Sequence, residues 1–238
     1  MTTAQGTNPT NDEGAEGEIV PVAFSEYREH EPETPGVHDE SVTDDAELRP
    51  DYAAVIERIA QAAPGLVVMD EAYQPFASAD SLALMARQPN VLVMRTMSKF
   101  GLAGVRIGYL LGAAELVEQV EKLRPPYNIS VLNAEAALFA LEHAGVYAAQ
   151  AAELRRQRER LLAALQAMPG IAPWPSQGNM ILARVQDAAA TFAALKARGV
   201  LIKNVSAMHP LLANCLRITV GTPEENTLLL QALQACLN

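Results

Sequence analysis

The hydrophobic and polar positions of this chain alternate between short apolar runs and longer stretches with helical spacing. Runs with the length and β-branched content of buried strands lie at 66–69, 91–94, 105–111, 180–185, 200–205 and 215–220. Helices are predicted over 52–63, where apolar residues recur at helical spacing, and over 81–87, 114–123, 128–142, 147–168 and 187–199. A final helix is predicted where Thr222-Pro223-Glu224-Glu225 combines a capping box with a proline at the first helical position. This alternation of strands and helices predicts an α/β fold.

Residues 1–50 differ in composition from the rest of the chain. They hold 13 Asp or Glu and two Arg, whereas the remainder holds 15 acidic and 16 basic residues and is close to neutral. The pattern predicts an acidic, disordered tail. Within it, residues 19–27 could form a short strand, but no nearby segment offers an obvious partner.

Composition excludes several classes of protein. No apolar run approaches the roughly 20 residues that span a bilayer, and the first residues lack the basic and apolar regions of a secretory signal. Cys215 and Cys236 are too few for a disulfide framework and have no metal-ligand spacing. The near-neutral remainder shows no basic stripe. We therefore expect a cytoplasmic protein without a metal site, a membrane segment or a nucleic-acid partner.

A dense run of charge lies within the predicted helix 147–168. It covers residues 153–160, where two glutamates and four arginines surround a leucine and a glutamine. The simplest interpretation is a solvated helix face and not a binding patch.

The clearest chemical signal follows the apolar run 91–94. Thr96, Ser98 and Lys99 come directly after it, then a glycine-rich turn, and Arg106 stands seven residues beyond the lysine. Packing alone explains this combination poorly. It fits a site in which the lysine forms a Schiff base while the hydroxyls and the arginine hold a phosphate.

A second signal closes the apolar run 66–69. Asp70 ends that run, and Tyr73 follows three residues later. Because ligands of open α/β sheets bind at strand ends, Asp70 is expected beside Lys99. An aspartate there can pair with a pyridinium nitrogen and keep the ring protonated.

The segments Asp70-Glu71-Ala72-Tyr73, Thr96-Met97-Ser98-Lys99 and 101–109 occur in the order found in fold type I pyridoxal-phosphate enzymes. The chain from about residue 53 to its end resembles this class, and within it histidinol-phosphate aminotransferase. The segments 124–128 and 216–226 extend the likeness. The resemblance implies pyridoxal 5′-phosphate as cofactor, small-molecule amino-donor and 2-oxoglutarate substrates, and a homodimer.

The resemblance also implies roles for individual residues. Lys99 would carry the cofactor and shuttle a proton, Asp70 would face the ring nitrogen, and Tyr73 would bond the ring phenolate oxygen. Thr96, Ser98 and Arg106 would hold the phosphate. For the substrate, Arg217 would grip an anionic group, with Asn179 nearby, although a strand arginine or a turn asparagine can also be purely structural. Lys203 stands where relatives often carry a second arginine, and a lysine lacks the bidentate fork.

The resemblance further implies a division of the chain. Residues 51–147 would form part of a three-layer αβα cofactor domain, and residues 148–238 a small α+β domain. The family carries about half its length before the matched region, including an aromatic ring that stacks on the cofactor. Residues 1–50 show none of those features.

The resemblance therefore implies one leading function and two alternatives. The first is transamination between L-histidinol phosphate and 2-oxoglutarate, which yields imidazole acetol phosphate and L-glutamate in histidine biosynthesis. The second is a related enzyme of the same fold with another amino-acid substrate, or a phosphothreonine decarboxylase. The third is a truncated, catalytically impaired fragment.

Overall fold

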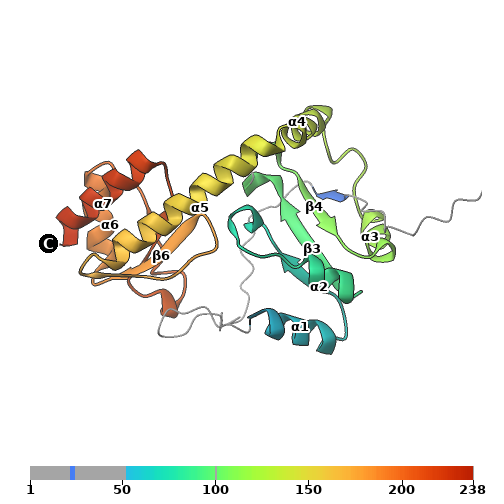
Figure 1. The fold of residues 1–238 in the computed structure, drawn as a ribbon, viewed down its shortest axis with the longest axis horizontal. Helices are drawn as coiled ribbons and strands as arrows, with labels where there is room; N and C mark the ends of the chain where they lie inside the picture. Colours follow the sequence, from blue (N-terminus) through green and yellow to red (C-terminus); the bar gives the residue numbers. More distant parts are fainter. Residues whose placement is uncertain (1–21, 25–51, 100, 238) are drawn as a thin grey trace, which may run out of the picture.

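The computed structural model describes residues 22–24, 52–99 and 101–237, which form two lobes joined by one long helix (Figure 1). The helices and strands of the first lobe are β1 (Val22–Phe24), α1 (Tyr52–Ala62), β2 (Val67–Asp70), α2 (Leu82–Arg87), β3 (Val91–Thr96), β4 (Gly108–Leu111), α3 (Ala114–Glu121) and α4 (Val131–Glu142). Three short 3-10 turns join them: η1 (Gln74–Phe76), η2 (Met97–Lys99) and η3 (Ala103–Val105).

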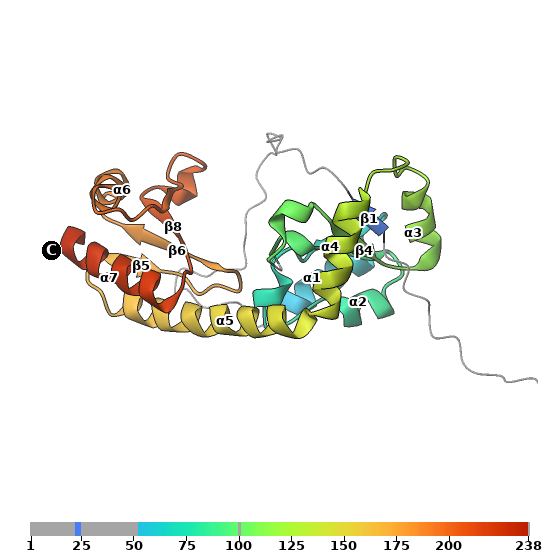
Figure 2. The same cartoon turned by 90° about the horizontal axis from the view of Figure 1, so that it is seen from above.

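The connecting helix is α5 (Ala144–Gln166), which runs along both lobes (Figure 2). At 1.5 Å per residue its 23 residues span about 34 Å. The second lobe contains β5 (Ile171–Pro173), β6 (Met180–Val185), α6 (Ala188–Ala197), β7 (Lys203–Asn204), η4 (Pro210–Leu212), β8 (Cys215–Thr219) and α7 (Pro223–Leu237).

The first sheet has the strand order β1-β4-β3-β2. Strands β2 and β3 are parallel, so their carboxyl ends meet at one edge, with Asp70 opposite Met94. Strand β4 runs antiparallel to β3. Strand β1 pairs antiparallel with β4, so this part of 19–27 does have a partner, which lies far along the chain. The rest of residues 1–50 lies outside the described residues.

Two predicted strands are shorter than their apolar runs. Strand β4 begins at Gly108 and not at residue 105, because Val105 and Ile107 pack against α4 instead of extending the ladder. Strand β7 covers only two residues of the run 200–205, since Val200 and Ile202 pack onto the core of the second lobe. No pattern in the sequence predicted β5, a three-residue edge strand that ends in Pro173.

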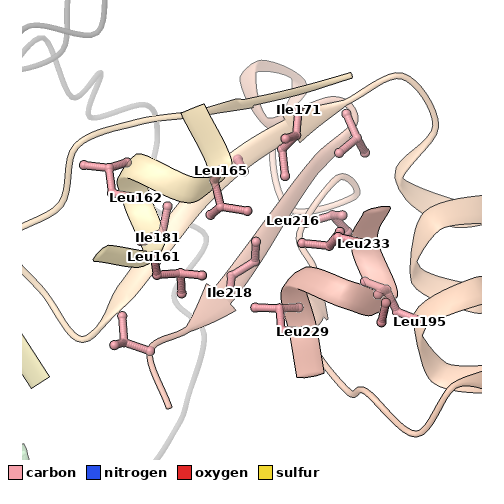
Figure 3. Packing of buried hydrophobic residues seen from close by; sticks show 14 of the residues in the cluster. Leu161, Leu162, Leu165, Ile171, Ile181, Leu195, Leu216, Ile218, Leu229 and Leu233 are labelled. Atoms are coloured by element: carbon pink, nitrogen blue, oxygen red, sulfur yellow. The ribbon is translucent and has the colours of Figure 1, made fainter. Parts of the chain in front are cut away.

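The second sheet is antiparallel, in the order β5-β6-β8-β7. Its inner face packs on α5, α6 and α7 through a cluster of leucine, isoleucine, valine and alanine side chains (Figure 3). Leu165, Ile181, Ile218 and Leu233 have no exposed surface in this cluster. This is the largest buried core in the described part of the chain.

The predicted helix signals are confirmed in the second lobe. The Asp187 carboxylate accepts a hydrogen bond from the amide of Ala190 at the start of α6. At the start of α7, the Thr222 hydroxyl accepts from the amide of Glu225, and the Glu225 carboxylate accepts from the amide of Thr222. The two reciprocal bonds are the predicted capping box.

The interpretation of residues 153–160 as a solvated face is wrong for two of them. Gln157 and Arg158 are 4% and 5% exposed. Arg158 lies three and seven residues before Leu161 and Leu165, so it shares their buried side of α5. Helical spacing therefore overrides the local concentration of charge.

Candidate active site

The candidate site lies at the carboxyl ends of β2 and β3. Asp70 is the last residue of β2, and Thr96 is the last residue of β3. Because β2 and β3 are parallel neighbours, both chains leave the sheet at the same edge. The Asp70 Oδ1 accepts a hydrogen bond from the amide of Ala72 at 3.0 Å, which holds the carboxylate against the turn that leads to Tyr73.

Lys99 and Tyr73 meet at this edge. Lys99 ends the 3-10 turn η2 immediately after β3, and Tyr73 caps η1 after β2. The Lys99 Nζ lies 5.0 Å from the centroid of the Tyr73 ring, within the range of a cation–π contact. Among the described residues, no carboxylate lies within ion-pair distance of Lys99. Its ammonium therefore lies against an aromatic face and has no counter-charge in the described part of the chain.

Two hydroxyls and an arginine form a compact polar group beside the lysine. The Thr96 hydroxyl donates to the carbonyl of Ile107 at 3.3 Å and accepts from the amide of Ser98 at 3.1 Å. The Arg106 Nη1 donates to the Ser98 hydroxyl at 3.3 Å. Arg106 adopts a left-handed conformation, with φ 54° and ψ 41°. This backbone is uncommon for a residue other than glycine, and its cost is typical of functional sites.

The opposite face of the same sheet carries a charged group that the sequence did not predict. Glu71 follows Asp70, so the two carboxylates project to opposite faces. Glu71 accepts hydrogen bonds from Arg95 Nε at 2.9 Å and Nη2 at 2.8 Å, and the same Nη2 lies 3.2 Å from Asp80. Burial alone lowers the pKa of Arg95, but the hydrogen bonds and charge of Glu71, together with Tyr109, raise it overall. The group is a partly buried ion pair that ties β2 to β3.

A cavity of about 290 Å³ also lies on the Glu71 face. Its lining includes Glu71, Arg95, Tyr109 and Arg155, and it shares only Thr96 with the residues of the candidate site. The charged groups in its wall are already paired with protein partners. We therefore place the candidate site at the side chains around Lys99 and not in this cavity.

Arg217 and Asn179 belong to the second lobe. Arg217 lies in β8 between Leu216 and Ile218, which are fully buried, and it is only partly buried itself. Its Nε is buried and has no hydrogen-bond partner among the described residues. Across the strands, Arg217 pairs in register with exposed Lys203 of β7. No hydrogen bond or ion pair in the described chain joins Arg217 to the Lys99 group.

The Asn179 loop does reach the first lobe. The Asn179 carbonyl accepts from the amide of Val220, which ties the loop to the end of β8. At the preceding Gly178, a Cβ atom would lie 3.7 Å from Cδ1 of Tyr73. The two lobes therefore contact each other next to the tyrosine that covers Lys99.

Comparison with known proteins gives the family. The model of the aminotransferase class I and II family matches residues 49–233. The chain belongs to this family. It is 62% identical over 188 residues to the histidinol-phosphate aminotransferase of Methylibium petroleiphilum, a match that covers 78% of this chain and 51% of that protein. It is 63% identical over 192 residues to the same enzyme of Acidovorax sp. strain JS42, with 77% and 52% covered.

The chain spans about half the length of the curated relatives that it matches. Among solved structures, it resembles the histidinol-phosphate aminotransferase of Sinorhizobium meliloti in complex with pyridoxal-5′-phosphate. That match has a TM-score of 0.66 and 30% identity, and covers 78% of this chain and 52% of the other. A Clostridium acetobutylicum histidinol-phosphate aminotransferase aligns with a TM-score of 0.70 and 19% identity, covering 79% and 59%. The predicted class is confirmed: this is the α/β fold of the fold type I aminotransferases.

The residues at the strand ends fit the chemistry of pyridoxal phosphate. Within the described residues, Lys99 and Arg106 have no carboxylate partner, and the Asp70 carboxylate has no basic one. A phosphate complements Arg106 with two neighbouring hydroxyls, a protonated ring nitrogen complements Asp70, and an aldehyde complements the Lys99 amine. The described part of the chain holds no cluster of three or more metal-ligating side chains. None of its helices is long and apolar enough to cross a membrane.

Proposed function

We propose that this chain is a pyridoxal-phosphate-dependent aminotransferase of the histidinol-phosphate type. It would transfer the amino group of L-histidinol phosphate to 2-oxoglutarate and form imidazole acetol phosphate and L-glutamate, a step of histidine biosynthesis. The observation that carries the proposal is the Lys99 ammonium, held by the Tyr73 ring and free of an acidic partner among the described residues, at the ends of two parallel strands. Two relatives at 62–63% identity, each named histidinol-phosphate aminotransferase, support the choice of reaction.

Three residues would act on the reacting atoms. When bound, pyridoxal phosphate supplies an electron sink for the negative charge that develops at the substrate α-carbon. Lys99 would attach the cofactor through Nζ and, once substrate has displaced it, carry the proton of the α-carbon. Asp70 would keep the ring nitrogen protonated. Tyr73 would donate its phenolic hydrogen to the ring oxygen, and its ring covers the Lys99 amine on one side.

The remaining site residues would hold anionic groups. Thr96, Ser98 and Arg106 would bind the cofactor phosphate through two hydroxyls and a guanidinium. Arg217 would bind the anionic group of the substrate, since its buried Nε is a donor still without an acceptor among the described residues. Asn179 would lie beside the substrate on the loop that contacts Tyr73.

Cofactor binding and attachment test the proposal directly. Pyridoxal phosphate added to the purified chain should produce a visible absorbance band that L-histidinol phosphate changes. Borohydride reduction should then fix a pyridoxyl group on the peptide that contains Lys99. Lys99→Ala should abolish the label, whereas Lys122→Ala, at an exposed lysine of the same lobe, should retain it. A label that persists in Lys99→Ala would reject the assignment.

A homodimer and a cytoplasmic location belong to the same proposal. Several large apolar side chains of α4 are exposed, including Val131 at 76%, Leu132 at 80% and Phe139 at 58%. Such a surface is more typical of an interface than of a solvated helix. Light scattering coupled to gel filtration tests the dimer.

We also propose the division of the chain into an acidic tail (1–50), a partial cofactor domain (51–147) and a small domain (148–238).

A further inference from the structure

The guanidinium of Arg158 is a buried charge that bonds backbone carbonyls from both lobes. Its side chain is only 6% exposed. Nη1 donates to the carbonyl of Phe76 at 2.9 Å and to the carbonyl of Gly178 at 3.1 Å. Its remaining bonds go to Glu159, whose side chain is 63% exposed.

Both carbonyls lie in segments that carry candidate site residues. Phe76 ends the turn η1, and its amide donates to the carbonyl of Tyr73 at 3.0 Å, so one turn contains both residues. Gly178 precedes Asn179 and lies against the Tyr73 ring. Arg158 therefore connects the Tyr73 turn (73–78) to the Asn179 loop (176–179).

Two weaker contacts reinforce this junction. The amide of Ser78 donates to Gln177 Oε1 at 2.9 Å, and Arg155 Nη1 donates to the carbonyl of Pro75. The Gln177 contact is exposed, and the Arg155 contact reaches only one of the two segments. Within the described residues, Arg158 is the buried side chain that bonds both.

We propose that Arg158 is a positioning residue that sets the separation between the Tyr73 turn and the Asn179 loop, and with it the opening of the active site. Burying a guanidinium is costly, and packing alone would be served as well by leucine or methionine at this position. Both bonds leave one nitrogen, Nη1, whose two hydrogens are fixed in the guanidinium plane, whereas the ammonium of a lysine rotates freely on a flexible stem. The consequence for substrate binding rests on the proposed function, whereas the junction itself does not.

Hydrogen exchange of the full chain tests the junction without any assumption about activity. Arg158→Met should raise exchange about tenfold or more in peptides covering 73–78 and 176–179, because a lost bond to a charged donor frees both loops. Peptides of β6 and β8 in the core should keep their protection. Arg158→Lys keeps the charge and should give an intermediate increase, so the test stands if the methionine variant fails to fold.

Arg156→Met is the matched control, since Arg156 is exposed on the same helix and, among the residues that the structure describes, pairs only with Glu153. It should leave both loops unchanged. Unchanged exchange in the two loops of Arg158→Lys and Arg158→Met would overturn the proposal. An equal rise of hydrogen exchange throughout the core of the second lobe would also overturn the proposal. It would mean that Arg158 stabilises the whole lobe and does not position the two loops.

The kinetic test separates this proposal from the proposed function. If the wild-type chain transaminates, Arg158→Lys should raise KM for L-histidinol phosphate about tenfold with a smaller change in kcat, while Lys99 still accepts the pyridoxyl label. Unchanged KM and kcat despite loosened loops would remove Arg158 from substrate positioning. A wild-type chain without transaminase activity would reject the proposed function and leave the exchange result to decide the junction.

Discussion

The ammonium of Lys99 lies 5.0 Å from the centre of the Tyr73 ring, although the two residues follow different strands. Parallel pairing of β2 with β3 brings their carboxyl ends together and places one residue over the other. The ring shields one side of the amine and adds a favourable interaction of about 0.5–1 kcal/mol at a partly exposed position. The same ring lies beside Gly178 of the second lobe, and the amide of Ser78 bonds Gln177 there, so this pair lies where the lobes meet.

The first prediction separates the ring of Tyr73 from its hydroxyl. Tyr73→Phe keeps the ring over Lys99 and removes one hydrogen bond to the cofactor, so we expect roughly two- to tenfold weaker binding of pyridoxal phosphate. Tyr73→Leu should weaken it further. An absorbance titration measures both. Tyr109→Phe, on the Arg95 face of the sheet, is the control and should change little. Equal affinities for all three variants and the wild type would exclude Tyr73 from the cofactor site.

The second prediction concerns the ion pair on the other face of the sheet. The Arg95 and Glu71 side chains are 15% and 10% exposed, so Arg95→Met leaves a nearly buried carboxylate without its partner. We expect a loss of about 2–4 kcal/mol in the free energy of unfolding. Arg87→Met breaks an exposed pair with Glu57 and should cost about 0–1 kcal/mol. Urea denaturation of both variants makes the comparison, and similar losses would contradict the structural role of Arg95.

The third prediction tests Arg217 as the anion-binding residue. Arg217→Ala should reduce kcat/KM for both L-histidinol phosphate and 2-oxoglutarate. Because one charge-assisted interaction is lost, the reduction should correspond to about 1.5–3 kcal/mol of transition-state stabilisation. Arg198→Ala is a suitable control, because Arg198 is exposed and bonds a carbonyl of its own helix. An unchanged kcat/KM for both substrates in Arg217→Ala would leave this arginine a purely structural role.

The fourth prediction concerns the capping box of α7. Thr222→Ala removes the hydroxyl that accepts from the amide of Glu225 and should destabilise the chain by about 1 kcal/mol. Thr227→Ala, within the same helix, should lie within about 0.5 kcal/mol of wild type, since the exposed Thr227 hydroxyl bonds the Pro223 carbonyl of its own helix. Thermal unfolding monitored by circular dichroism distinguishes the two. A larger loss for Thr227→Ala would mean that the box does not hold the helix end.

Local signals located most of the elements and the candidate residues. Local patterns predicted both ends of α1 and α6 within one or two residues, and the capping box predicted the first residue of α7. The order of Asp70, Tyr73, Lys99 and Arg106 after apolar runs indicated a candidate site, since ligand-binding groups of an α/β sheet follow its strands. Alternation along a strand also separates Arg217 from its neighbours Leu216 and Ile218, which are fully buried on the other face of β8.

Tertiary contacts decided what no local pattern contains. The partner of β1 lies far along the chain, so its pairing with β4 depends on the folded sheet. The run 105–111 begins with a turn because Val105 and Ile107 pack against α4, which leaves Arg106 in a left-handed conformation. Arg158 lies in a run of charge that reads as a solvated face, and only the docking of the two lobes supplies carbonyls that make its burial possible. Sequence by itself therefore determined the helices, the family and the candidate chemistry of this protein. The tertiary structure alone decided which charges are buried and how the lobes meet, because both depend on partners distant in the chain.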